Sequence, residues 1–131
     1  MRDPSKAGAV GHASSAAAAV VLLAMSAGAA AAADAEHGKA LYQTCAACHT
    51  GQPDALGPSL KGVVGRKAAA LEGFRYSNPK KRANLVWDED NVRAYIRDPQ
   101  AKVKGNRMPY GGLTDAKDVD DIIAYLKTLG D

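Results

Sequence analysis

Both cysteines of this 131-residue chain fall within five positions, in the stretch "CAACH" at residues 45–49. Two residues separate Cys45 from Cys48, and His49 follows directly. This spacing suits three chemistries: a redox-active dithiol, half of a zinc site, or the covalent attachment of a haem through two thioether bonds. The remainder of the chain has to distinguish among them.

The first two chemistries find little support elsewhere in the sequence. A thioredoxin-type dithiol follows a strand of a sheet, and no stretch of this chain alternates convincingly as a strand would. Structural zinc takes four Cys or His ligands, and beyond the motif only His37 remains after residue 33. We expect His37 to be solvent-exposed. Haem attachment explains every member of the motif, because each thiol adds to a vinyl group and His49 projects its imidazole at the iron.

The N-terminus has the three parts of a secretory signal peptide. A short basic region precedes the alanine-dominated run "AAAAVVLLAMSAGAAAAA", and Ala31 and Ala33 form an A-x-A site just before "DAEHG". We predict a cleavable signal peptide at residues 1–33 and an exported, periplasmic domain at residues 34–131. The alternative is that the run, about long enough to span a bilayer, is retained as a membrane anchor. Export agrees with haem attachment, because a periplasm oxidises free thiols.

Three segments of the predicted mature chain have helical patterns. Residues 35–44 have helical composition, and a second helix starts at a good N-cap, Asp88, and stops before Pro99. Thr114 can cap a third helix, which Gly130 is placed to end. The apolar stripe of this third helix consists of Val119, Ile122, Ile123, Leu126 and Leu129.

The segments between these helices are long and rich in glycine and proline. Residues 50–84 allow only a short helix around "SLKGVVG", and a second loop reads "QAKVKGNRMPYGG". The fold class is therefore all-α with long loops. Loops of this length in so short a chain are usually functional or disordered, and ordered ones need something to wrap around.

Met108 is the candidate for the second axial ligand of a haem iron. It is the only methionine beyond residue 33, and it lies in the polar, turn-rich stretch "GNRMPYGG" rather than on an apolar helix face where a methionine fills a core. His37 is the other candidate. A thioether favours reduced iron and raises the potential. With His49 and Met108 both bound, no position is left for a substrate, which indicates an electron carrier rather than an oxygenase or peroxidase.

Several stretches, in this order, resemble the class I cytochromes c, specifically the small bacterial periplasmic monohaem carriers related to mitochondrial cytochrome c. These stretches are "CAACH", "GPSLKGVVGRK", "GFRYSNP", the tryptophan at 87, "YIRDP", "GNRMPYGGL" and "DIIAYLKTL". The resemblance implies the fold of that family: crossing terminal helices, a third helix between them, and long loops wrapped around one haem c. The haem would be attached covalently through Cys45 and Cys48.

The resemblance also implies roles around the two axial ligands. The carbonyl of Pro58 would accept the ring N–H of His49, which fixes the tautomer and strengthens the ligand. The hydroxyl of Tyr95 would approach the sulfur of Met108. The alternative for Tyr95 is ordinary core packing.

A further set of residues is implied to contact the haem propionates. Arg66, Tyr76 and Trp87 resemble the groups that hydrogen-bond a buried propionate, and Asn106 occupies a place where the family often has another such group. Arg66 could instead be a surface charge, and Trp87 could be core. Lys80 departs from the family, because many relatives have a polar neutral residue near that place.

The charge of the chain is mild but uneven. The formal net charge is +3, and it becomes +2 once residues 1–33 are removed, which is too little to indicate nucleic-acid binding. Two basic clusters precede Trp87 and Met108: Arg75, Lys80, Lys81 and Arg82, then Lys102, Lys104 and Arg107. In the family likeness both flank the haem crevice, so we expect a basic rim that steers redox partner proteins with acidic surfaces. The alternative is that these basic residues are ordinary solvent-exposed surface charges with no docking role.

We therefore expect a soluble periplasmic electron carrier and not an enzyme. We expect a monomer, with no stable membrane insertion unless the signal is retained as an anchor. One alternative is a dedicated haem subunit of a periplasmic or membrane oxidoreductase complex. Another is a peroxidase or gas-binding cytochrome in which Met108 is displaced.

Overall fold

The computed structural model describes residues 8, 10–11 and 31–130, so the predicted signal peptide lies almost wholly outside the described residues. The helices of residues 31–130 are α1 (Ala35–Ala46), α2 (Asn78–Arg82), α3 (Glu89–Arg97), α4 (Pro99–Lys102) and α5 (Ala116–Thr128). Within this range no strand forms, and a single antiparallel bridge joins Lys67 to Val86. The all-α prediction is confirmed. Of the helices described, none combines the length and apolar character needed to cross a bilayer.

The helix ends follow local signals in the sequence. The Asp88 carboxylate accepts the backbone N–H of Asn91 at 2.8 Å and caps α3, while Pro99 begins the separate helix α4. The prediction that Thr114 caps the last helix is wrong. Asp115 is the cap, and its carboxylate accepts the N–H of Asp118 at 3.0 Å, because an anionic acceptor also interacts favourably with the positive end of the helix.

The helix predicted around residues 59–65 does not form. The chain instead makes two turns in which Gly62 and Gly65 have φ angles of +64° and +89°, values that a right-handed helix excludes. Two short helices that the sequence patterns did not indicate, α2 and α4, occur in the loops. Each has a proline in its first turn, Pro79 and Pro99, where the missing N–H costs nothing.

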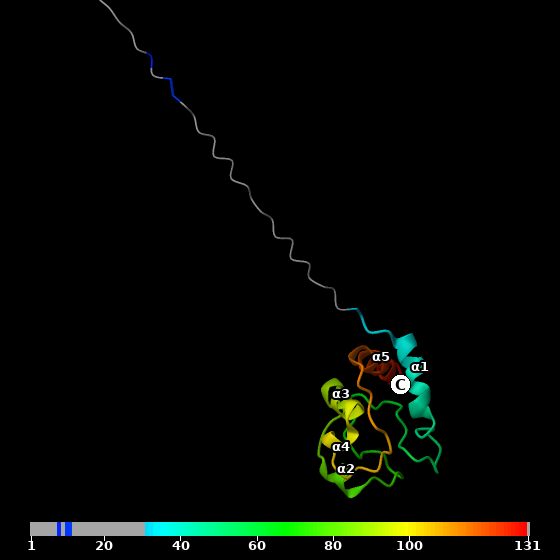
Figure 1. Ribbon diagram of the computed structural model, residues 1–131. Helices are drawn as coiled ribbons and strands as arrows, with labels where there is room; N and C mark the ends of the chain where they lie inside the picture. The colour runs from blue at the N-terminus through cyan, green and yellow to red at the C-terminus, as the bar shows by residue number, and fades with distance from the viewer. Residues whose placement is uncertain (1–7, 9, 12–30, 131) are drawn as a thin grey trace, which may run out of the picture. The chain divides into compact units, whose positions relative to one another are not determined.

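The first and last helices pack closely against each other, as Figure 1 shows for α1 and α5. Gly38 makes this approach possible, because a Cβ atom at that position would lie 2.0 Å from the backbone oxygen of Asp121. One turn further on, the rings of Tyr42 and Tyr125 pack with centroids 5.1 Å apart. The C-terminal end of α1, which carries Cys45, is thereby fixed relative to α5.

The buried face of α5 forms most of the hydrophobic core together with α3 and the loop before it. The buried members of this core are Val63, Ala68, Trp87, Val92, Val119, Ile122, Ile123 and Leu126. Backbone hydrogen bonds tie the long loop to it: Gly65 donates to Trp87, Trp87 donates to Arg66, and Ala68 donates to Leu85, each at 2.8 Å. These bonds hold part of the long loop beside the core, next to a cavity.

Candidate haem site

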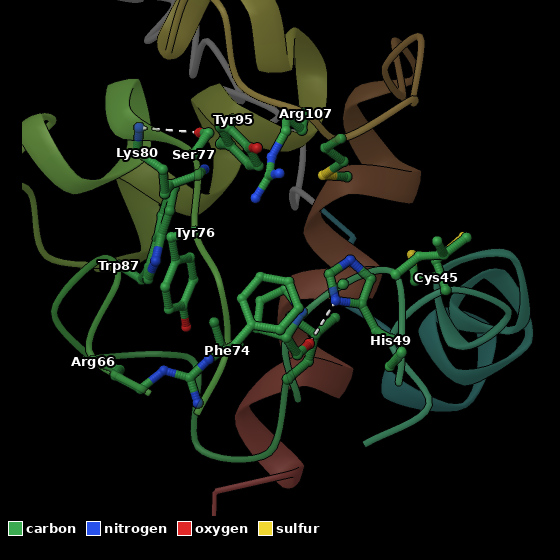
Figure 2. A pocket seen from close by; sticks show the side chains of 18 of the residues that line it. Cys45, His49, Arg66, Phe74, Tyr76, Ser77, Lys80, Trp87, Tyr95 and Arg107 are labelled. Carbon is green, nitrogen blue, oxygen red and sulfur yellow. Dashed lines mark hydrogen bonds between the residues drawn. The ribbon is translucent and has the colours of Figure 1, made fainter. Parts of the chain in front are cut away.

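A cavity of about 610 Å³ lies between the core and the long loops (Figure 2). It is lined by every predicted site residue except Asn106: Cys45, Cys48, His49, Pro58, Arg66, Tyr76, Trp87, Tyr95 and Met108. His49 and Cys45 lie on one side in Figure 2, and Arg66, Tyr76 and Trp87 lie on the other. Residues that are up to 63 positions apart in the sequence therefore meet around one space.

The "CAACH" motif forms a tight turn at the end of α1. Cys45 lies in the last turn of the helix, and its carbonyl oxygen accepts the backbone N–H groups of Cys48 at 3.1 Å and His49 at 2.9 Å. Cys45, Cys48 and His49 therefore all line the cavity from one turn. Both thiols are free, and burial raises the pKa of the Cys45 thiol. Two thiols held in one turn can form two thioether bonds to one group.

The imidazole of His49 is held by a hydrogen bond to Pro58 and by close contact with the backbone of Gly57. Its Nδ1 lies 2.6 Å from the carbonyl oxygen of Pro58. Because a carbonyl only accepts, Nδ1 carries the proton and Nε2 keeps a lone pair that can bind a metal. Burial lowers the pKa of His49, which favours this neutral form. Gly57 leaves room for the ring, since a Cβ there would lie 2.5 Å from Cε1.

Met108 lies in a loop that Asn106 holds in place. The Asn106 side-chain oxygen accepts the backbone N–H of Met108 at 2.8 Å, and its amide nitrogen donates to the carbonyls of Pro99 and Val103 at 2.8 and 2.9 Å. Asn106 is buried and does not line the cavity. The sequence resemblance implied a propionate contact for Asn106. The structure shows that its side chain positions the Met108 backbone, and the propionate contact stays a prediction.

The wall opposite His49 combines a charged group with aromatic rings. The Arg66 guanidinium donates to the carbonyls of Ser59 and Lys61 at 2.8 and 2.9 Å, which leaves N–H donors on the same fork for an anionic group. Burial lowers the pKa of Arg66, but it remains far above neutrality for a guanidinium. Tyr95 packs on Trp87 with ring centroids 4.9 Å apart, and burial raises its pKa to about 12, so its hydroxyl keeps the proton.

Lys80 belongs to one of the basic clusters and is also the position where the sequence departs from the family beside the haem. In the structure it is half-buried and lines the cavity. Its ammonium lies 3.5 Å from the ring centroid of Tyr95 and 4.6 Å from that of Trp87. Burial lowers its pKa from 10.5 to about 8. The departure from the neutral residue of many relatives was the one signal in the sequence that could have indicated this position.

The residues around the cavity fit a covalently attached haem. The volume lies within the range of sites that enclose cofactor-sized ligands, about 300–1,000 Å³. The lining includes two thiols, a neutral imidazole and a thioether. Nitrogen and thioether donors are the pair that holds iron in electron-carrying haem proteins.

Comparisons with known proteins agree with this description. The family model "Cytochrome c" matches residues 35–130. The cytochrome c2 of Blastochloris viridis is 42% identical over 97 residues, covering 72% of this chain and 76% of that protein. The cytochrome c of Euglena viridis is 41% identical over 101 residues, covering 75% of this chain and 99% of that protein. The solved structure of cytochrome cH from Methylobacterium extorquens superposes with a TM-score of 0.69 at 44% identity, covering 72% of this chain and 98% of the other.

A helical fold wrapped around a cavity, with its attachment turn at the end of the first helix, defines a c-type haem protein. The chain belongs to the cytochrome c family, in its class I. It is an electron-transfer cytochrome that holds one haem c covalently through Cys45 and Cys48. The family, the fold and the cofactor predicted from the sequence are thus confirmed.

Proposed function

We propose that the protein is a soluble periplasmic electron shuttle, exported by a signal peptide that is cleaved after Ala33, with His49 and Met108 as the axial ligands of its haem iron. The observation that carries the proposal is the placement of these two side chains. They come from separate loops and line one cavity. The His49 ring donates to the Pro58 carbonyl, and the Met108 backbone N–H donates to the Asn106 side-chain oxygen. With both coordination positions filled, the protein exchanges electrons and is not an enzyme.

The chain holds its ligands so that little has to move during electron transfer. When bound, the haem supplies a reversible one-electron change at its iron, and a thioether ligand favours the reduced state. The hydrogen bond from His49 Nδ1 to Pro58 keeps the ring in one tautomer and orientation. The bonds of Asn106 keep the Met108 backbone in place.

The polar residues of the opposite wall suit the carboxylates of a haem. Arg66 lines the cavity with Tyr76 and Trp87, and these three bring a guanidinium, a phenol and an indole to one region. Buried carboxylates need such donors to compensate for lost hydration. We assign the three residues to propionate binding, in the roles that the sequence resemblance implied.

Exposed basic residues stand around the mouth of the cavity and beside it. Arg75 and Arg107 line the cavity, and the Arg107 guanidinium donates to the Arg75 carbonyl, which joins the two basic clusters. Arg82, Lys102 and Lys104 surround a shallow neighbouring groove. We assign this rim to transient docking of redox partners with acidic surfaces. The rate of electron exchange with such a partner should fall as salt is added.

Spectra of the exported holoprotein test the axial ligands. We expect the ferric protein to show the charge-transfer band of a sulfur–iron bond, Met108→Ala to lose it, and only the variant to bind carbon monoxide readily when reduced. Gly111→Ala is the matched control. It lies in the same loop with no atom within 4 Å of the added Cβ, so it should leave the band unchanged. An unchanged band in Met108→Ala, or rapid carbon monoxide binding by the unsubstituted protein, would contradict the proposal.

A further inference from the structure

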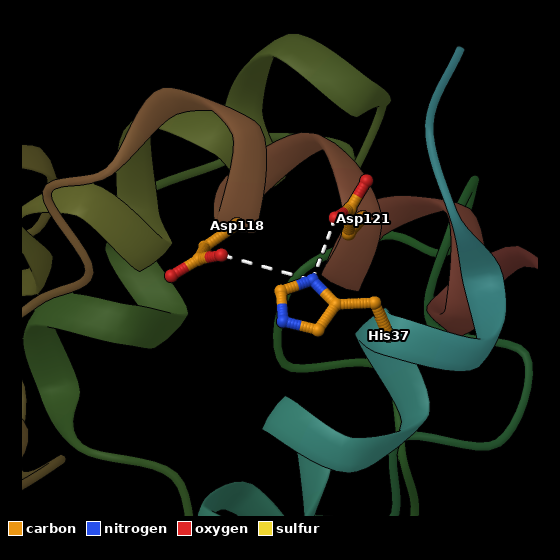
Figure 3. A group of neighbouring side chains, drawn as sticks. All are labelled: His37, Asp118 and Asp121. Carbon is orange, nitrogen blue, oxygen red and sulfur yellow. Dashed lines mark hydrogen bonds and ion pairs between the residues drawn. The ribbon is translucent and has the colours of Figure 1, made fainter. Parts of the chain in front are cut away.

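A fully buried carboxylate links the two terminal helices outside the haem cavity. The side chain of Asp121, on α5, has no exposed surface. Its Oδ1 accepts the backbone N–H of Asp34 at 2.7 Å, and its Oδ2 lies 2.8 Å from Nδ1 of His37 (Figure 3). The ammonium of Lys117 donates to both oxygens, at 2.9 and 2.7 Å. A buried carboxylate requires such partners, and these hold the pKa of Asp121 well below its usual range.

The Asp34 nitrogen that contacts Asp121 lies both at the start of α1 and at the predicted cleavage site. Asp34 is the N-cap of α1, and its own carboxylate accepts the N–H groups of Glu36 and His37. It also directly follows Ala33, the last residue of the predicted signal peptide. If the peptide is removed there, this nitrogen changes from an uncharged amide with one donor into an α-ammonium with three donors and a full positive charge.

We propose that cleavage after Ala33 converts the hydrogen bond between Asp34 and Asp121 into an ion pair, so that Asp121 is the binding site for the new N-terminus. The inference rests on the proposed export and processing, and it adds a structural consequence of that processing. Asp121 then contacts the first helix segment with both its backbone and its side chain. Its backbone oxygen faces Gly38, and its carboxylate holds the end of the chain four residues earlier.

The charges around this nitrogen favour a cation there. The titratable groups near this nitrogen are Asp118, Asp121 and Lys117 on α5 and Asp34, Glu36 and His37 in its own segment. Of these, Asp121 accepts from this nitrogen directly, and Asp34 and Asp118 add negative charge to a cluster whose other cation is Lys117. The positive N-terminal end of the α1 dipole disfavours a nearby ammonium. The Asp34 carboxylate counteracts this effect, because it accepts the first N–H groups of that helix.

The same cluster does not require a metal ion. One ligand atom each of His37, Asp118 and Asp121 lies within 4.8 Å of the others. Lys117, however, already donates to both oxygens of Asp121. The Lys117 ammonium already compensates the charge of this carboxylate, and the α-ammonium would be a second positive charge supplied by the chain.

The ion pair makes a specific prediction about pH. An ordinary α-amino group has a pKa of about 7.7–8.0, and an ion pair raises this pKa in the folded state. A raised pKa of a basic group means that the added stability is fully present below about pH 8. It is lost as the pH rises through the folded-state value.

A pair of holoproteins that differ only at the N-terminus tests the proposal. One begins at Asp34, and the other keeps Ala32 and Ala33, so that the Asp34 amide can still donate to Asp121. We expect the first to unfold at a higher denaturant concentration at pH 7 and the difference to vanish by about pH 10. ¹⁵N NMR titration should place the Asp34 α-amino pKa at least about one unit above its ordinary range, a tenfold change in the protonation equilibrium.

Two variants and one mass measurement complete the test. Asp121→Asn should remove the difference between the two forms, whereas Asp118→Asn, on the same helix but without a bond to the Asp34 nitrogen, should retain it. Equal unfolding midpoints at every pH and an ordinary α-amino pKa in the unsubstituted protein would overturn the ion pair, whether or not Asp121→Asn folds. An intact mass that places the N-terminus of the exported holoprotein elsewhere would overturn the cleavage site, and this outcome is separate from the behaviour of the pair.

Discussion

Replacing Lys80 by methionine is expected to stabilise the holoprotein at neutral pH. The natural side chain places a half-buried ammonium in the cavity, 3.5 Å from the ring centroid of Tyr95. Methionine has a similar length, is flexible and carries no charge. The variant therefore removes the cost of burying the cation while it keeps most of the contacts with the aromatic rings.

The size of the effect follows from the pKa of Lys80. Burial lowers it from 10.5 to about 8, and at about 1.36 kcal/mol per unit of pKa this corresponds to about 3.4 kcal/mol as an upper limit. Solvent reaches part of the side chain and screens the charge. The faces of Trp87 and Tyr95 also attract the cation. With both effects subtracted, we expect a net gain of about 1 kcal/mol in the free energy of unfolding at pH 7.

The sign of the pH dependence distinguishes this explanation from a simple gain in packing. Between about pH 8 and pH 10.5 the unfolded chain keeps the Lys80 proton and the folded chain releases it, so the natural protein gains stability as the pH rises through this range. The advantage of Lys80→Met should therefore shrink over the same range and be absent above it.

Guanidinium unfolding of the ferric holoproteins at pH 7 and pH 10.5 measures both quantities. Lys81→Met is the matched control, because Lys81 lies next to Lys80 in α2 but is exposed. It should change the free energy of unfolding by less than about 0.5 kcal/mol at either pH. A loss of stability in Lys80→Met at pH 7, or an equal gain at both pH values, would refute the reasoning.

Two further predictions concern glycines whose missing side chains leave room for a neighbour. Gly38→Ala should destabilise the protein by about 3 kcal/mol or more, since its Cβ would lie 2.0 Å from the Asp121 oxygen; a thermal melt within a few degrees of the parent would contradict this. Gly57→Ala should displace the His49 ring, because the added Cβ would lie 2.5–2.9 Å from three of its atoms. The visible spectrum and the midpoint potential should both change, and retention of both would show that the ring tolerates the contact.

The parts of the protein that were predictable from the sequence are those specified by neighbours in the chain. The attachment motif is complete within five residues, and one helical turn is enough to place Cys45 and His49 together. The third main helix carries its own apolar stripe, and Asp88 and Pro99 mark the ends of another. Such signals act through local hydrogen bonding and periodicity, which a sequence displays directly.

The errors and omissions occur where distant segments decide the outcome. A run that resembled a helix becomes turns at Gly62 and Gly65, where the chain bonds to a segment more than twenty residues away. For Asn106 the resemblance implies a haem contact, and the structure adds hydrogen bonds from its amide to two carbonyls that the sequence did not indicate. Lys80 was counted with its exposed neighbours because nothing in the local sequence shows that α2 turns it toward Trp87.

The crossing of α1 and α5 includes a long-range contact that no local pattern encodes. Gly38 and Asp121 are 83 positions apart in the sequence, yet the missing Cβ of one lies against the backbone of the other. This contact fixes α1 relative to α5, and α1 ends in the turn that carries Cys45. The haem attachment point and the core of α5 are therefore parts of one rigid unit. A change at the helix crossing should consequently act on the haem site as well, even though Gly38 does not line the cavity.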